Sequence, residues 1–164
     1  MDLILMRHGD AFSVGENGIT RDADRPLSVK GRKVTREIAD ALKALGVEPA
    51  LILTSPLVRA AQTAAIAAEC WNGKPVEPCQ ALACGGTPAG VVAAFRSHAV
   101  PCLLAVGHIP DLGELASYLI CGTPGAGIVF RKSGVCLIRF EGEPRAGAGS
   151  LEWLAPPCLL LGKG

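Results

Sequence analysis

The chain has 164 residues, of which 49% are hydrophobic, so it fits a single domain over residues 1–164 with a sizeable core. Its 16 basic and 15 acidic side chains give a formal net charge of +1, which argues against a general nucleic-acid or membrane-binding surface. The N-terminal apolar run is too short for a signal peptide or a membrane span, so we expect a cytoplasmic protein.

Apolar runs alternate with helical patterns along the chain, which predicts an α/β three-layer sandwich, a mainly parallel central sheet with helices on both faces. The predicted strands are 2–6, 51–54, a short strand within 76–82, and 102–106. The predicted helices are 29–45, 56–68, 88–97 and 110–119. We expect residues 12–25 to form a long polar loop over the site, and 134–140 with 151–156 to form a hairpin at the sheet edge.

Two helix starts carry N-cap signals. Ser28 is a plausible N-cap for the first helix, which Gly46 ends, and Thr87 precedes a proline at the first helical position. An apolar stripe on the first helix indicates the face that packs on the sheet, namely Val34, Ile38, Ala41, Leu42 and Leu45.

Three fragments place an imidazole or a guanidinium after a predicted strand. Arg7-His8-Gly9 follows the first strand, Ser55 to Arg59 follows the second, and Gly107-His108 follows 102–106. Open α/β sheets bind ligands at the carboxyl ends of their strands, and Gly9 lets backbone and ligand approach closely. The three strand ends therefore predict a cationic pocket suited to a phosphoryl group.

These fragments also resemble a known family. The set R-H-G, S-P-x-x-R-A-x-Q-T and G-H, in that order, resembles the histidine phosphatase superfamily, in the branch that includes cofactor-dependent phosphoglycerate mutases. The opening M-R-H-G-D-A, the segment Arg25 to Ser28 leading to Gly31, and V-G-H-x-P-D resemble the SixA-like phosphohistidine phosphatases. The likeness runs from Met1 to about Leu119 and thins out in the last third of the chain.

The resemblance implies a phosphoglycerate mutase-like fold and a set of roles. His8 would be the nucleophile that forms a phosphohistidine intermediate, and Arg7, Arg59 and His108 would bind the phosphoryl oxygens. Arg25 would be a further phosphate ligand.

Other residues of the motifs have expected supporting roles. Gly9 and Asp10 border the phosphate site, and Asp10 is a candidate proton donor or orienting residue, since SixA-like chains carry an acidic residue there. We expect Gln62 and Thr63 to support Arg59 and its helix. Neighbouring cations favour the neutral imidazole that a nucleophilic histidine needs. No metal and no cofactor is implied.

Some titratable residues have plainer interpretations. His98 lies in no motif and is expected to be a hydrogen-bonded loop residue. Asp22-Ala23-Asp24 has no partner ligand nearby in sequence, so we expect loop solvation or an ion pair with Arg21 rather than a metal site.

The range 79–100 contains no Asp or Glu that could protonate a leaving alkoxide, and the nearest candidates are Glu77, Asp111 and Glu114. An imidazole can leave neutral once its ring is protonated, so the gap favours phosphohistidine over sugar or glycerate phosphates. The short chain points to an open site for a phosphorylated protein, either a histidine-phosphotransfer domain or a phosphotransferase-system carrier. Two alternatives remain, namely a broad small-molecule phosphomonoesterase or mutase and a non-catalytic phosphoprotein-binding module.

The chain has seven cysteines, an odd number with no C-x-x-C pair, which argues against a disulfide framework or a zinc knuckle. We expect most of them to be buried thiols. Cys84, in the flexible Ala83 to Gly86 segment, is the one that could face a substrate.

Overall fold

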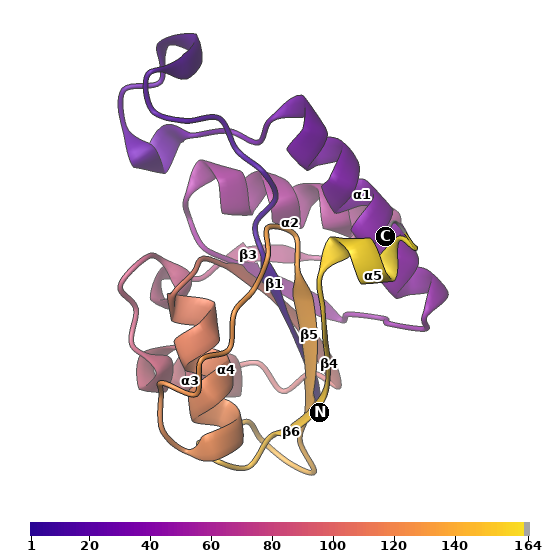
Figure 1. Ribbon diagram of the computed structural model, residues 1–164. Coiled ribbons are helices and arrows are strands. Elements are labelled where there is room, and N and C mark those ends of the chain that lie inside the picture. Colours follow the sequence, from indigo (N-terminus) through magenta and orange to yellow (C-terminus); the bar gives the residue numbers. More distant parts are fainter. Residues whose placement is uncertain (163–164) are drawn as a thin grey trace.

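The computed structural model describes residues 1–162, and it contains one six-stranded mixed sheet in the order β3-β2-β4-β1-β5-β6 (Figure 1). The strands are β1 (Asp2–Arg7), β2 (Leu51–Thr54), β3 (Val76–Pro78), β4 (Cys102–Gly107), β5 (Val135–Arg139) and β6 (Ser150–Ala155). β1 to β4 pair in parallel, whereas β5 pairs antiparallel with both β1 and β6. The predicted hairpin at the sheet edge is therefore confirmed.

Within residues 1–162, five α-helices and three short 3-10 helices accompany the sheet. The α-helices are α1 (Val29–Ala44), α2 (Val58–Cys70), α3 (Pro88–Arg96), α4 (Asp111–Cys121) and α5 (Pro157–Leu160). The 3-10 helices are η1 (Glu16–Gly18), η2 (Asp22–Asp24) and η3 (Gln80–Leu82).

The sheet separates two apolar cores, which gives the predicted three layers. Side chains alternate between the faces of a strand, so Leu3 and Leu5 of β1 pack with α3 and α4, while Ile4 and Met6 pack with α1 and α2. Figure 1 shows α3 and α4 together on one side of the sheet and α1 and α2 on the other. Both faces are covered, which is why the central strands read as continuous apolar runs.

The two predicted N-caps are confirmed. Ser28 Oγ accepts a hydrogen bond from the backbone N–H of Gly31 at 2.9 Å, and Thr87 Oγ1 accepts one from Gly90 at 3.2 Å. In the predicted stripe of α1, Ile38 and Leu42 are buried, but Leu45 lies beyond the helix end and is 64% exposed.

Two details of the helices differ from the sequence-based expectation. The second helix begins at Val58 rather than Pro56, because Leu57 is extended and its N–H bonds back to Ser55 Oγ. The polar loop contains η1 and η2, and α5 follows β6, none of which the sequence indicated.

The expectation that most of the cysteines are buried was wrong. Of the seven free cysteines only Cys79 and Cys136 are buried, whereas Cys84, Cys121 and Cys158 are exposed. None of the helices within residues 1–162 is long and apolar enough to cross a membrane.

Candidate active site

The three strand ends singled out in the sequence meet at one edge of the sheet. β4 lies between β1 and β2, with Arg7 opposite Gly107 and Thr54 opposite Val106. The residues that follow β1 and β2 are held on β4 as well, because His8 N–H donates to the carbonyl of Gly107 at 3.1 Å and Ser55 N–H donates to that of Val106 at 3.0 Å. As a result His8 and His108, 7% and 2% exposed, face each other with ring centroids 5.1 Å apart.

Hydrogen bonds fix the tautomer of His8. Its Nδ1 lies 2.7 Å from the carbonyl oxygen of Gly9, which can only accept, so Nδ1 carries the proton. Nε2 therefore holds a lone pair, and Arg59 Nε donates to it at 3.2 Å. This is the protonation pattern that a nucleophilic imidazole requires.

Both histidines are held neutral. Burial, and then the charges of Arg59, Arg7 and Arg25, lower the pKa of His8 to about 4, although its bond to Gly9 acts in the opposite direction. Burial is also the main cause that lowers the pKa of His108 to about 3, followed by the charges of His8 and Arg59. At neutral pH both rings are thus uncharged bases within a cationic pocket.

The S-P-x-x-R-A-x-Q-T motif connects the site to its surroundings. Thr63 Oγ1 donates to the carbonyl of Arg59 at 2.7 Å and accepts from Gly9 N–H at 3.1 Å, so it ties α2 to the chain after His8. Gln62 Oε1 accepts from the backbone N–H of Leu27 at 2.8 Å. The supporting role expected for Thr63 is confirmed, while Gln62 holds the neighbouring R-P-L-S segment.

Asp22 is a site residue that the sequence analysis missed. Its carbonyl accepts from Arg59 NH1 at 2.8 Å and its Oδ2 from NH2 at 3.0 Å, while Asp24, not Asp22, pairs with Arg21. The expected ion pair of this segment with Arg21 is therefore right for Asp24 and wrong for Asp22. The one signal in the sequence was the position of Asp22 three residues before Arg25, with which it also pairs at 2.8 Å.

Arg25 lies near the site but is engaged elsewhere. Its Nε donates to the carbonyl of Phe12 at 2.6 Å and its NH1 to Asp22. Its charge still contributes to the lowered pKa of His8. In this arrangement Arg25 braces the 12–25 loop through Phe12 and Asp22.

Asp10 and Gly9 shape the turn after β1. The carboxylate of Asp10 accepts from Ser28 Oγ at 2.7 Å and forms an ion pair with Lys132, and these contacts hold its pKa below the usual range. An ionised Asp10 orients the turn and is a poor proton donor. A Cβ on Gly9 would lie 2.6 Å from Thr35 Oγ1, and one on Gly31 would lie 2.0 Å from the carbonyl oxygen of Asp10. Glycine is required at both places by close packing.

Two nitrogens of the predicted phosphate ligands have no hydrogen-bond partner within residues 1–162. Arg7 donates through NH1 to the carbonyl of Phe130 at 2.9 Å, but its buried Nε is unpaired. His108 Nε2 lies 2.8 Å from Ser55 Oγ, and its buried Nδ1 is unpaired. Unmet polar groups of this kind are costly unless a ligand or water satisfies them.

The remaining candidates lie outside this cluster of contacts. Glu77 is exposed on β3, the Asp111 carboxylate accepts from Gly85 N–H at 3.1 Å, and half-buried His98 lies in the turn after α3. Cys84 is exposed, and burial of part of its surface is the main cause that raises the pKa of its thiol, which favours the unreactive protonated form. Among the described residues no group of three or more His, Cys, Asp or Glu could hold a metal ion.

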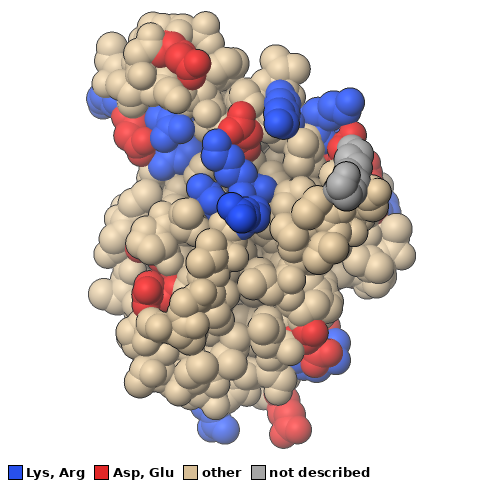
Figure 2. Space-filling model, in the orientation of Figure 1, with Lys and Arg blue, Asp and Glu red and all other residues tan. Residues whose placement is uncertain are grey.

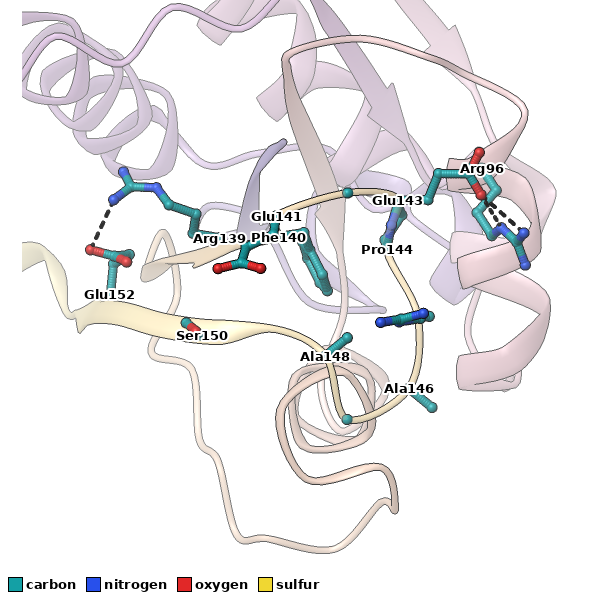
Figure 3. A pocket seen from close by; sticks show the side chains of 13 residues that line it. Arg96, Arg139, Phe140, Glu141, Glu143, Pro144, Ala146, Ala148, Ser150 and Glu152 are labelled. Atoms are coloured by element: carbon teal, nitrogen blue, oxygen red, sulfur yellow. Dashed lines mark hydrogen bonds and ion pairs between the residues drawn. The ribbon is translucent and has the colours of Figure 1, made fainter.

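A large cavity lies away from this cluster. It measures about 800 Å³ and is lined by the β5–β6 hairpin and Arg96 (Figure 3). Ion pairs of Arg96 with Glu143 at 2.9 Å and of Arg139 with Glu152 at 3.3 Å neutralise charges along its wall. The hairpin adjoins the start of β1, because Phe140 N–H bonds to the carbonyl of Met1, so this cavity is at the opposite end of the sheet from His8.

The carboxyl ends of the parallel strands carry two neighbouring neutral histidines and two arginines, which is where α/β proteins with open sheets bind their ligands. Residues 3–83 match the histidine phosphatase superfamily, branch 1. Phosphohistidine phosphatase SixA of Escherichia coli is 31% identical over 166 residues, covering 98% of this chain and 96% of the relative. The chain belongs to the histidine phosphatase superfamily.

Two further comparisons agree with that assignment. An uncharacterised protein of Picosynechococcus sp. is 39% identical over 146 residues, which is 85% of each chain. The solved structure of the protein histidine phosphatase SixA complexed with tungstate superimposes with a TM-score of 0.81 at 30% identity, covering 98% of this chain and 99% of that one. The fold and family expected from the sequence motifs are thereby confirmed.

Proposed function

We propose that this chain is a metal-independent phosphatase that removes the phosphoryl group from phosphohistidine in a signalling or phosphotransfer protein. The observation that carries the proposal is His8, whose Nδ1–H is bonded to Gly9 and whose Nε2 lone pair faces the guanidinium of Arg59. The SixA name of two relatives supports the substrate class.

In the first step His8 Nε2 attacks phosphorus, a nitrogen–phosphorus bond forms on His8, and the bond to the substrate imidazole breaks. The substrate ring, protonated on its other nitrogen, leaves as a neutral imidazole. The His8 ring then carries a positive charge, which the hydrogen bond from Nδ1–H to the Gly9 carbonyl at 2.7 Å stabilises.

In the second step water attacks phosphorus, His8 leaves as a neutral imidazole, and the water proton goes to the released phosphate. Arg59 and Arg7 would hold the non-bridging oxygens while the phosphoryl group moves. The unpaired Arg7 Nε supplies a donor for that purpose. If the Ser55 hydroxyl donates its hydrogen bond to His108 Nε2, the neutral His108 ring carries its proton on Nδ1. The unpaired Nδ1–H would then be a second donor to the phosphoryl oxygens.

Asp22 favours a second candidate, a phosphomonoesterase on the same scaffold. Its carboxylate contacts Arg59, which is itself hydrogen-bonded to His8, so the site contains a carboxylate that the sequence analysis had not placed there. Its hydrogen bond to Arg25, and then its contact with Arg59, lower the pKa of Asp22, however, and an ionised carboxylate cannot protonate a leaving alkoxide. The phosphohistidine substrate is therefore the better proposal.

The experiment that tests the proposal is quenched-flow capture of an acid-labile phosphoenzyme after mixing with a phosphohistidine protein, with and without EDTA. We expect a burst of phosphoenzyme that EDTA leaves unchanged and that His8→Ala lacks. A chain that binds the phosphoprotein without forming phosphoenzyme would be a binding module, and one that needs a divalent metal would contradict the proposed mechanism.

A further inference from the structure

Residues 129–133, which we name the rim segment, are anchored to the site by hydrogen bonds to Arg7 and His8. The carbonyl of Phe130 accepts from Arg7 NH1 at 2.9 Å, and Ser133 N–H donates to the carbonyl of His8 at 3.2 Å. Phe130 and Ser133 are 0% and 1% exposed. The rim segment therefore holds a fixed position relative to the two residues that begin the R-H-G motif.

The other residues of the rim segment point outward. Val129 is 66% exposed, and Arg131 and Lys132 are exposed as well. Lys132 is paired with Asp10, but the Arg131 guanidinium makes no hydrogen bond or ion pair within residues 1–162. On the other side of the site Ile109, next to His108, is 38% exposed. The site is thus bordered by apolar side chains and an uncommitted cation.

Basic side chains gather on the face of the protein that Figure 2 shows. The formal net charge is only +1, yet Figure 2 shows Lys and Arg gathered at the centre of the face, over the upper end of the sheet. Lys30 and Lys132 both act on the carboxylate of Asp10, which places Lys30 at the same edge. A local positive field of this kind steers an acidic partner into register with the site.

We propose that the rim segment docks an acidic protein surface surrounding the phosphohistidine, with Arg131 as its charged contact and Val129 as its apolar one. This inference rests on the proposed function and adds the chemistry of the partner. A small phosphorylated molecule bound at His8 would gain nothing from outward-pointing side chains, whereas a phosphorylated side chain brings its own protein surface against them.

The test compares kcat/KM for two substrates that share the reacting bond. One is an acidic histidine-phosphotransfer domain phosphorylated on histidine, and the other is phosphoramidate. We expect Arg131→Glu to lower kcat/KM for the phosphoprotein about tenfold or more and to leave phosphoramidate within about twofold. Added salt should lower the wild-type value and shrink the difference. Unchanged phosphoramidate turnover also shows that the variant is folded.

The matched control is Arg145→Glu, which makes the same charge change on the exposed hairpin at the opposite end of the sheet. It should leave both substrates unaffected. Val129→Glu repeats the test at the apolar position and should again affect only the phosphoprotein.

The outcomes separate the docking inference from the proposed function. The docking surface is overturned if Arg131→Glu cleaves the phosphoprotein as well as the wild type does. It is also overturned if Arg131→Glu loses activity equally on both substrates, or if Arg145→Glu loses as much activity on the phosphoprotein as Arg131→Glu does. If the wild type cleaves phosphoramidate but no phosphohistidine protein, the proposed function fails, and the docking surface fails with it.

Discussion

Asp22 holds the guanidinium of Arg59 at two points, through its backbone carbonyl at 2.8 Å and its carboxylate at 3.0 Å. These are the terminal nitrogens with which an arginine clamps a phosphoryl group. Asp22 is on the 12–25 loop, which Figure 1 shows extending above the carboxyl edge of the sheet. The carboxylate is thus an anion already bound to Arg59, and we expect it to compete with substrate for this guanidinium.

We predict that Asp22→Asn binds phosphate and tungstate more tightly, by roughly two- to fivefold, because an ion pair whose carboxylate faces solvent is worth about 1 kcal/mol. Inhibition constants measure this. Asp24→Asn, which loses only the pair with Arg21, is the control. Weaker anion binding by Asp22→Asn would mean that Asp22 positions Arg59 rather than competing with substrate.

His8→Ala should abolish turnover, since no other side chain at the end of β1 can carry the phosphoryl group. The cations persist, so the variant should still bind tungstate weakly in a titration calorimeter. His98→Ala, in the turn after α3, should keep full activity. Substantial turnover by His8→Ala would contradict the assignment of the nucleophile.

Arg59→Lys should lower kcat/KM by about 100-fold or more. The guanidinium donates to His8 through Nε and to Asp22 through both terminal nitrogens, and an ammonium cannot serve all three positions in a fixed plane. Steady-state kinetics on phosphoramidate measure the loss. Arg36→Lys on the outer face of α1, where Arg36 pairs with Glu69, is the matched control.

Stability should fall on acidification below pH 6.5. The pKa values of His8 and His108 are lowered to about 4 and about 3, so in that range the unfolded chain binds protons that the folded chain does not. Lowering the pH from 7.5 to 5 should cost about 2 kcal/mol of unfolding free energy for each of the two histidines. Urea unfolding at both pH values measures this cost.

In the same experiment His108→Gln should reduce the difference between the two pH values, whatever its effect on stability itself. His98→Gln should leave that difference unchanged. An equal stability of the wild type at pH 7.5 and pH 5 would show that the two rings are not held neutral by the fold.

The rate with phosphoesters should fall steeply as the leaving-group pKa rises, while phosphorus–nitrogen substrates remain fast. The carboxylates of Asp22 and Asp10 are both kept ionised by basic partners, so neither is a good acid for an alkoxide. The measurement is kcat/KM for a phosphohistidine protein against an alkyl phosphate at matched pH. Comparable values would favour the phosphomonoesterase.

The sequence by itself determined the elements and the edge of the sheet that carries the site. β2 lies at the predicted residues 51–54, and β1 and β4 each extend one residue further than predicted. Buried parallel strands are continuous apolar runs, and N-caps such as Ser28 are local signals, so short stretches of chain suffice to identify them. The proximity of His8 and His108 could be predicted as well, because the carboxyl ends of parallel strands lie at the same edge of a sheet.

Only the tertiary structure decided which groups contact one another within that edge. The contacts of Asp22 with Arg59, and of the rim segment with Arg7, join residues 37 and 123 positions apart. The tautomer of His8 likewise depends on where the Gly9 carbonyl points. Such contacts depend on the path of loops, which no periodicity encodes, and a charged side chain takes whichever partner the folded backbone brings within hydrogen-bonding distance.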